Sequence, residues 1–176
     1  THGGSLRAYL VHAASSRPQS PSVPALLARE RAMGLHRVAT YSAFAERVRA
    51  SKRKLLSLLI GLKNEGKTIC GYGAPGKGNT LLNYCGIGTD FLDFTVDRNP
   101  HKHGHFTPGM HIPILPLEAI ELARPDYVLI LPWNLRDEIM AQMAHIADWG
   151  ARFIVPIPEP RIVEPNGNAK WREVVS

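Results

Sequence analysis

A glycine-rich turn is the part of this sequence whose residue types most clearly indicate chemistry. Residues 68–82 read TICGYGAPGKGNTLL, in which an apolar run is followed by four glycines and then by a helical pattern. Glycine lets a backbone turn sharply and approach a ligand closely, and the N–H groups at a helix start favour phosphate. Lys77 adds a positive charge at this place and Asn79 adds a neutral donor. The segment therefore predicts an anion-binding site.

The spacing of these glycines leaves more than one interpretation open. Gly71, Gly73 and Gly76 fit the dinucleotide-binding pattern Gly-x-Gly-x-x-Gly. Asp97 ends the next apolar run, where a ribose-binding acid would be expected. The glycines could equally serve only a tight connection between a strand and a helix. A P-loop is disfavoured, because Gly78 stands where that loop needs Ser or Thr to hold magnesium.

A second polar segment, residues 97–111, reads DRNPHKHGHFTPGMH and contains four histidines. Three of them alternate at positions 101, 103 and 105, which suggests a metal site. However, glycine and proline interrupt a regular strand here, and no nearby cysteine or second carboxylate completes a coordination shell. We therefore expect no metal. The side chains expected to face an anionic ligand or solvent are Arg98, Lys102 and His103.

Aromatic and amide side chains follow other apolar runs. Trp133 and Asn134 come directly after the run Tyr127–Leu131, and Tyr72 ends the run before the glycines. Asn134 is a good helix cap, and Trp133 either packs in the core or stacks on a base or sugar. We predict that all three lie at a ligand-binding edge. A polar start to the chain could form either a frayed end or the rim of that site, with the candidates His2, Ser5 and Arg7.

Short apolar runs alternate with helical patterns from residue 67 onward. The expected strands are Thr68–Tyr72, Phe91–Val96, Tyr127–Leu131 and Phe153–Val155. The expected helices between them are Gly78–Cys85, Pro116–Ala123 and Asn134–Trp149. This alternation predicts an α/β fold, with a Rossmann-like parallel sheet covered by helices on both faces.

The first third of the chain has a different pattern. Ser5–His12 alternates like a strand, residues 13–24 form a Ser/Pro-rich linker, and Ala25–Met33 forms a short helix that stops at Gly34. Thr40 can cap a longer helix that runs to about residue 65 and packs on the core. We therefore divide the chain into an N-terminal strand and linker (1–24), a helical segment (25–66) and a Rossmann-like substrate-binding core (67–176), within one structural domain.

The composition limits the partners of the chain. Its 176 residues are 44% hydrophobic, and 21 basic residues against 15 acidic ones give a net charge of +6, which favours an anionic ligand. The basic run Arg47–Lys54 has no interleaved aromatic residues, so we expect no nucleic acid partner. No apolar run approaches the roughly 18 residues of a membrane span. The two cysteines form no Cys-x-x-Cys pair, so we expect a reduced, cytoplasmic setting.

No nucleophile stands at a diagnostic spacing from an acid and a base, so the chain resembles a binder more than a complete catalyst. Thr1 stands at its start in place of Met, and we expect it to be a processed or excised part of a longer protein.

Several segments together resemble the C-terminal domain of S-adenosylmethionine-dependent sugar C-methyltransferases over nearly the whole chain. They are His2–Arg7 (HGGSLR), Gly71–Asn83 (GYGAPGKGNTLLN), Asp97–Gly109 (DRNPHKHGHFTPG), Ile112–Ile114 (IPI) and Pro132–Asn134 (PWN). Such enzymes have a zinc-binding region, a central methyl-donor domain and a C-terminal Rossmann-like domain that helps hold a nucleotide-linked keto sugar. This chain resembles the last part only. One departure is Gly76, where a small alanine-like residue is more usual.

The resemblance implies a substrate, a reaction and a set of site residues. The substrate-binding residues would be Tyr72, Gly73, Lys77, Gly78, Asn79, Arg98, His103, Trp133 and Asn134. The reaction would remove a proton beside the ketone of an NDP-sugar, after which the carbanion attacks the donor methyl group. S-adenosylmethionine would bind to an upstream domain of the same polypeptide. We assign no catalytic base and expect no cofactor in this chain.

Two other functions remain open from the residues. One is an NAD(P)-dependent oxidoreductase-type dinucleotide-binding domain that uses residues 71–76 and Asp97. The other is a non-catalytic binding module. The position of Lys77 beside the glycine turn favours the diphosphate sugar over the dinucleotide.

Overall fold

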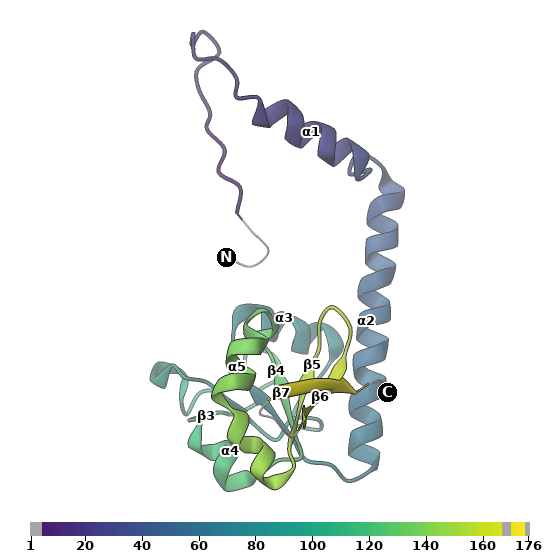
Figure 1. The fold of residues 1–176 in the computed structure, drawn as a ribbon, viewed down its shortest axis with the longest axis vertical. Coiled ribbons are helices and arrows are strands. Elements are labelled where there is room, and N and C mark those ends of the chain that lie inside the picture. The colour runs from purple at the N-terminus through teal and green to yellow at the C-terminus, as the bar shows by residue number, and fades with distance from the viewer. Residues whose placement is uncertain (1–4, 167–169, 175–176) are drawn as a thin grey trace. The chain divides into compact units, whose positions relative to one another are not determined.

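Three neighbouring parallel strands, β1 (Ile69–Tyr72), β2 (Thr95–Val96) and β4 (Tyr127–Ile130), end at the same edge of the sheet in the computed structural model. Figure 1 shows the whole fold. The structure describes residues 5–166 and 170–174. The chain forms two compact units, residues 1–48 and 49–176, and the sheet belongs to the second.

The described residues form a seven-stranded sheet in the order β3-β2-β1-β4-β5-β6-β7. The other strands are β3 (Ile114–Leu115), β5 (Arg152–Val155), β6 (Arg161–Asn166) and β7 (Lys170–Val174). The first five strands pair in parallel, whereas β6 and β7 add as an antiparallel extension. Because the strand order reverses between β1 and β4, the crevice at their carboxyl ends is the usual ligand-binding position of such a sheet.

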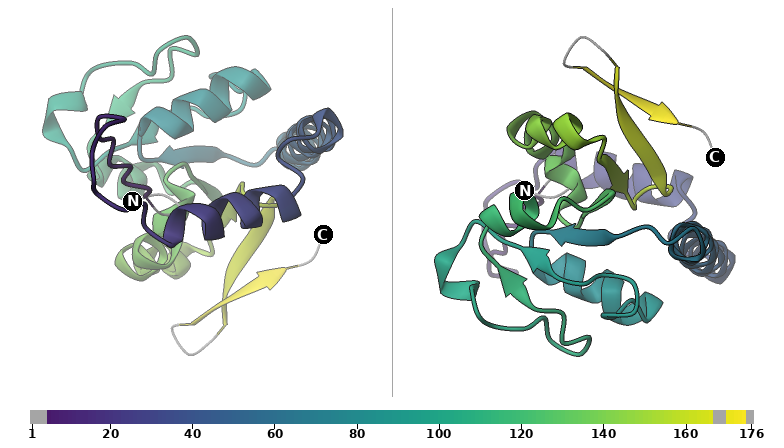
Figure 2. Two further views of the ribbon diagram at one scale, coloured as in Figure 1. Left: turned by 90° about the horizontal axis from the view of Figure 1, so that it is seen from above. Right: turned by 90° about the horizontal axis from the view of Figure 1, so that it is seen from below.

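Helices cover both faces of the sheet (Figure 2). They are α2 (Val38–Asn64), α3 (Gly76–Cys85), α4 (Glu118–Ala123) and α5 (Arg136–Gln142), with 3-10 turns η1 (Pro100–Lys102), η2 (Trp133–Leu135) and η3 (Ala144–Trp149). No helix of the described residues is long and apolar enough to cross a membrane. The α/β class predicted from the alternating pattern is confirmed.

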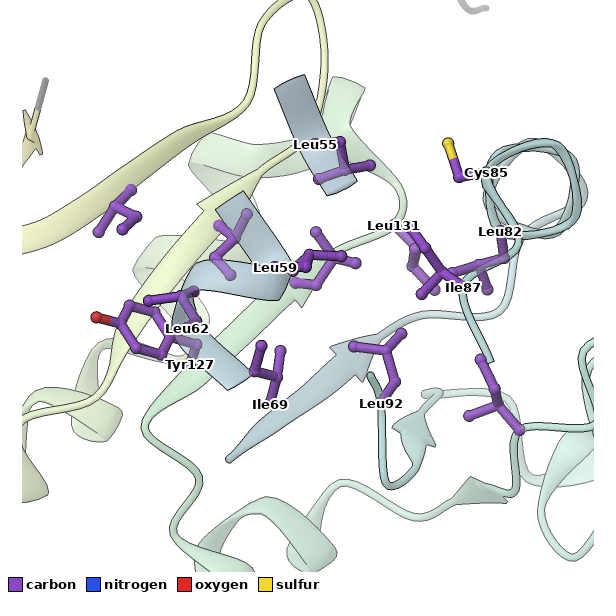
Figure 3. Packing of buried hydrophobic residues seen from close by; sticks show 14 residues of the cluster. Leu55, Leu59, Leu62, Ile69, Leu82, Cys85, Ile87, Leu92, Tyr127 and Leu131 are labelled. Atoms are coloured by element: carbon purple, nitrogen blue, oxygen red, sulfur yellow. The ribbon is translucent and has the colours of Figure 1, made fainter. Parts of the chain in front are cut away.

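Alternation along the strands divides the buried side chains into two clusters. Ile69 of β1 joins one cluster, in which Leu55 and Leu59 of α2 pack with Leu82 of α3 (Figure 3). Cys70, the next residue of β1, points to the other face and joins the cluster that includes residues of α4 and α5. Successive side chains of a strand point to opposite faces, so burial on both sides explains why these strands read as continuous apolar runs.

The helix boundaries agree with their sequence signals in part. Gly66 follows α2 with φ of +74°, and Gly86 caps α3 with φ of +77°, so both helices end at a glycine in the left-handed conformation. The first helix, α1 (Ser22–Ala32), begins three residues earlier than expected. Thr40 lies inside α2 and is not its cap; its hydroxyl donates a hydrogen bond to the carbonyl of Gly34 at 2.8 Å.

Three sequence expectations are wrong. Residues 5–12 form no strand, because no described segment pairs with them. The strand expected over Phe91–Val96 is limited to β2, Thr95–Val96. The long helix expected over residues 134–149 is divided into η2, α5 and η3, and Asn134 lies inside η2 instead of capping a helix. The expected parallel sheet is confirmed, with β6 and β7 as an antiparallel extension.

Candidate functional site

The glycine turn between β1 and α3 is held by backbone contacts to the neighbouring strands. Gly73 has φ of +85°, and its N–H donates to the carbonyl of Val96 at 2.6 Å. Its own carbonyl accepts a hydrogen bond from the Thr95 hydroxyl at 2.9 Å. A Cβ atom at position 73 would lie only 2.8 Å from Cδ of Pro132. Both the backbone conformation and the space at this position therefore require glycine.

The third glycine of the dinucleotide pattern has no packing role here. In that pattern the last glycine permits close approach of the helix to the strand. A Cβ at Gly76 would meet no atom within 4 Å, whereas a Cβ at Gly78 would lie 2.8 Å from Cβ of Leu131. Gly78 is thus the residue that lets α3 pack closely. Gly76 therefore matches the third position of the pattern in sequence but not in packing, whereas a Cβ at Gly71 would lie 2.6 Å from the hydroxyl oxygen of Thr95.

Asp97, at the end of β2, fixes the turn from the side. Its Oδ2 atom accepts hydrogen bonds from the backbone N–H of Ala74 and from Lys102 Nζ, both at 2.8 Å, and Oδ1 accepts one from the N–H of Asn99 at 2.9 Å. Burial raises the pKa of this carboxyl, but the hydrogen bonds outweigh burial, and the pKa lies below its usual value of 3.8. Asp97 is therefore a charged structural anchor of the turn.

Lys102 and His103 also face inward onto this anchor. Lys102 Nζ donates to the carbonyl of Ala74 at 3.1 Å in addition to its ion pair with Asp97. His103 Nε2 lies 2.7 Å from the carbonyl oxygen of Asp97. Because a carbonyl only accepts, this ring nitrogen must carry the proton. Lys102, expected to face a ligand or solvent, is instead committed to the Asp97 carboxylate.

Lys77 and Trp133 come together across the site. Lys77 Nζ lies 4.8 Å from the centroid of the Trp133 ring and over its face. The two side chains come from the first turn of α3 and from η2, which follow β1 and β4. Burial lowers the pKa of Lys77. The structure thus unites two sequence-predicted residues that are 56 positions apart.

A cavity of about 180 Å³ opens beside the turn. Four of the residues singled out from the sequence line it, namely Tyr72, Gly73, Asp97 and Arg98. Arg98 lies 3.8 Å from a carboxylate oxygen of Glu138 and 3.4 Å from the amide oxygen of Gln142, both on α5. Burial raises the pKa of Tyr72, so its hydroxyl stays protonated at neutral pH.

The two predicted asparagines differ in their surroundings. The Asn79 backbone carbonyl accepts a hydrogen bond from the Asn83 side chain at 2.8 Å. The Asn79 Oδ1 atom is buried and has no hydrogen-bond partner among the described residues. Such an atom costs about 1–3 kcal/mol relative to a satisfied one. Asn134 is exposed on η2.

Some of the predicted residues do not lie at the glycine turn or the cavity beside it. Ser5 and Arg7 belong to the first unit, and His2 lies outside the described residues, so their role at the rim remains a prediction. His103 contacts the main chain of Asp97 and does not line the cavity. Its part in binding also remains a prediction. The other predicted residues that lie outside the cavity lining are Lys77, Gly78, Asn79, Trp133 and Asn134.

Sequence reasoning missed much of the cavity wall. The additional lining residues are Pro75, Pro132, Leu135, Glu138, Ile139 and Gln142. Glu138 and Gln142 are four residues apart on α5, a spacing that places them on one helix face, and their side chains share a 2.9 Å hydrogen bond. This spacing, directly after the strand edge at Pro132, is the signal that could have found them.

NAD, one of the ligands considered from the sequence, does not fit these residues well. Dinucleotide-binding folds that take NAD use a carboxylate after the second strand to receive the ribose 2′-hydroxyl. Here both Asp97 oxygens already accept hydrogen bonds, and Lys102 neutralises the charge. No group of three or more His, Cys, Asp or Glu side chains in the described parts of the chain is arranged to hold a metal ion. The arrangement suits an anionic ligand better.

The sequence places the chain in a known class of domain. It belongs to the C-methyltransferase C-terminal domain family, whose model matches residues 1–158. A similar protein is the C-methyltransferase NovU of Streptomyces niveus, which is 42% identical over 165 residues. The match covers 92% of this chain but only 39% of the relative. The family resemblance is therefore confirmed, and the chain spans less than half the length of this relative.

Among solved structures, the crystal structure of UDP-D-quinovosamine 4-dehydrogenase from Vibrio fischeri is 20% identical, with a TM-score of 0.38. That match covers 62% of this chain and 93% of the other.

Proposed function

We propose that residues 49–176 bind the nucleoside diphosphate part of an NDP-keto sugar, as the substrate-holding part of an S-adenosylmethionine-dependent C-methyltransferase. The methyl-donor site and the catalytic base would lie in an upstream domain of the same polypeptide. The reaction would remove a proton from the carbon beside the ketone, and the carbanion would then attack the donor methyl group. This chain would contribute binding and orientation.

The observation that carries the proposal is the placement of Lys77 at the start of α3, directly after the glycine turn. The first N–H groups of a helix and its dipole favour an anion, and an ammonium in the first turn adds a full positive charge. Asp97 is neutralised by Lys102, so it does not oppose a diphosphate at this position.

The remaining groups suit the nucleoside and the sugar. Trp133 presents an aromatic ring beside Lys77, and such a ring can stack on a base or on the apolar face of a sugar. Asn79 offers a buried oxygen that a ligand hydroxyl or N–H could satisfy.

The size of the cavity favours a shared site. Its volume of about 180 Å³ is smaller than the roughly 300–1,000 Å³ of complete small-molecule sites, so it would hold only part of a nucleotide sugar. The rest of the ligand would extend toward the upstream domain, where its sugar would meet the methyl donor.

Calorimetric titration of the chain with dTDP- and UDP-sugars tests the proposal, with NAD and S-adenosylmethionine as comparison ligands. We expect selective binding of a diphosphate sugar, weakened about 10-fold or more in Lys77→Ala because a charge-assisted contact is lost. Lys63→Ala, which removes an equal charge at the end of α2, is the matched control and should bind like the wild type. Binding of NAD alone, or equal effects of the two substitutions, would contradict the proposal.

A further inference from the structure

Residues 6–11 have the composition of a buried strand but are exposed. Leu6, Tyr9, Leu10 and Val11 expose 77%, 73%, 91% and 54% of their surfaces, and no described residue between Ser5 and Val48 is buried. Their backbone groups form no hydrogen bond with another described residue. A strand-like apolar segment without a sheet is incomplete by itself, because neither its side chains nor its backbone groups have found partners.

The pattern of the segment indicates what kind of sheet would complete it. Leu6 and Leu10 would lie on one face of a strand, and Tyr9 and Val11 on the other. A strand at the surface of a two-layer protein alternates apolar and polar residues, whereas a strand with apolar residues on both faces belongs to a sheet covered on both sides. The missing partner is therefore the sheet of an α/β domain.

The connection that follows gives the segment freedom to reach such a partner. Residues 13–21 contain no helix or strand and are rich in Ser and Pro. Nine residues of extended chain span up to about 30 Å. The segment can thus belong to another domain without requiring the sheet of residues 49–176 to change.

We propose that residues 6–11 add as a strand to a sheet edge in the remainder of a longer polypeptide, the upstream part to which the proposed function assigns the methyl donor. This inference rests on the proposed function. The length of the Streptomyces niveus relative supports this choice of partner. The match covers 39% of that protein, so more than half of it lies outside the matched part and could supply the sheet. Main-chain hydrogen bonds would supply affinity, and pockets for the side chains on both faces would supply specificity.

Hydrogen exchange measures directly whether residues 6–11 join a sheet. The amides of residues 6–11 are compared in this chain alone and in a chimera in which it replaces the matched part of the Streptomyces niveus relative. We expect rapid exchange in the chain alone and slowing by about 100-fold or more in the chimera, as for amides of a stable sheet. If the chimera does not fold, the unmatched part of the relative is added as a separate polypeptide, with the same expectation. Rapid exchange in the presence of the folded partner overturns the inference.

A matched pair of variants separates strand addition from general hydrophobic contact. Leu10 and Leu122 expose 91% and 87% of their surfaces, so Leu10→Asp and Leu122→Asp should each leave the isolated chain as stable as the wild type. In the presence of the partner, Leu10→Asp should remove most of the protection of residues 6–11, and Leu122→Asp should leave it unchanged. Equal effects of both substitutions contradict the inference.

Other occupants give different results. If the amides of residues 6–11 are protected in the isolated chain at every protein concentration, the segment docks on the core of its own chain. If their protection rises with protein concentration, the segment pairs with a second copy. Either result overturns the inference. Titration with a diphosphate sugar distinguishes strand addition from the proposed function. The Leu10→Asp variant should bind the sugar like the wild type, because Leu10 lies outside the proposed sugar site. Protection in the chimera without sugar binding contradicts the proposed function alone.

Discussion

Lys102 Nζ lies 2.8 Å from Oδ2 of Asp97, and the same carboxylate oxygen accepts the backbone N–H of Ala74. This ion pair connects the end of β2 to the glycine turn after β1. The side chains of Lys102 and Asp97 are only 35% and 12% exposed, so water screens the pair less than an ion pair at the surface. The shape of the candidate phosphate site therefore depends on a charge that itself contacts no phosphate.

Asp97→Asn should destabilise the chain in a pH-dependent way. The folded-state pKa of Asp97 lies below its usual 3.8, so its stabilising contribution is present above the unfolded-state pKa and is lost as pH falls through the folded-state pKa. Urea unfolding should give a free energy lower by about 1–3 kcal/mol near pH 7, with the difference from wild type shrinking below about pH 4. Asp148→Asn, at an exposed acid, is the control. A constant difference across pH would contradict this prediction.

Gly76→Ala and Gly78→Ala should have opposite effects on stability. A Cβ at position 76 meets open space, so alanine there should be tolerated and should stabilise by up to about 1 kcal/mol through reduced unfolded-state entropy. A Cβ at position 78 would lie 2.8 Å from Cβ of Leu131, so the same change should cost about 1–3 kcal/mol. Thermal unfolding of both variants measures the difference. Destabilisation by Gly76→Ala would restore a structural role for the third glycine of the dinucleotide pattern.

The sequence predicted those parts of the fold that depend on local pattern. Runs of apolar residues located β1, β4 and β5, and Gly66 located the end of α2. The strand β3 has only two residues and no periodicity to detect. The pattern in residues 5–12 was read as a strand, but strand formation needs a partner, and pairing cannot be read from one segment alone.

The candidate site was predictable where residues follow strand ends, because the carboxyl ends of parallel strands meet at one edge. Tyr72 and Trp133 were predicted for this reason, and Lys77 from the glycine turn; their part in ligand binding stays a prediction. The role of Lys102 was predicted wrongly. Whether its ammonium faces a ligand or pairs with Asp97 depends on the path of the loop that contains η1, which the sequence alone does not give. The cavity residues on α5 depend on how that helix packs, which helical spacing alone does not fix.

Trp133 should report ligand binding through its fluorescence. Its ring faces Lys77 Nζ at 4.8 Å, so an anion bound by Lys77 changes the charge next to the indole. We expect a diphosphate sugar to shift the emission of wild type and of Trp149→Phe, but not of Trp133→Phe. Trp133→Leu should also weaken binding about 3- to 10-fold, since aromatic contacts of this kind contribute about 1 kcal/mol. An unchanged shift in Trp133→Phe would place the ligand elsewhere.

Glu138→Gln should strengthen the binding of a diphosphate sugar. Glu138 lines the cavity 3.8 Å from Arg98, so its negative charge both holds this guanidinium and repels an incoming anion. The two side chains are 57% and 63% exposed, and ion pairs of that kind contribute at most about 1 kcal/mol, so affinity should rise no more than about 5-fold. The gain should diminish at high salt, because screening weakens both the repulsion and the ion pair.

Glu118→Gln is the matched control for this prediction, since it removes the same charge from the exposed start of α4, away from the cavity lining. If both variants gain equally, the effect is one of net charge and not of Arg98. If Glu138→Gln loses affinity, Glu138 itself contacts the ligand, as it would with ribose hydroxyls. In that case Arg98→Ala should leave the affinity for the sugar nearly unchanged. If instead the Arg98 guanidinium binds the diphosphate, Arg98→Ala should lower that affinity about 10-fold or more. Titrating the three variants at low and high salt therefore decides which member of this pair receives the ligand.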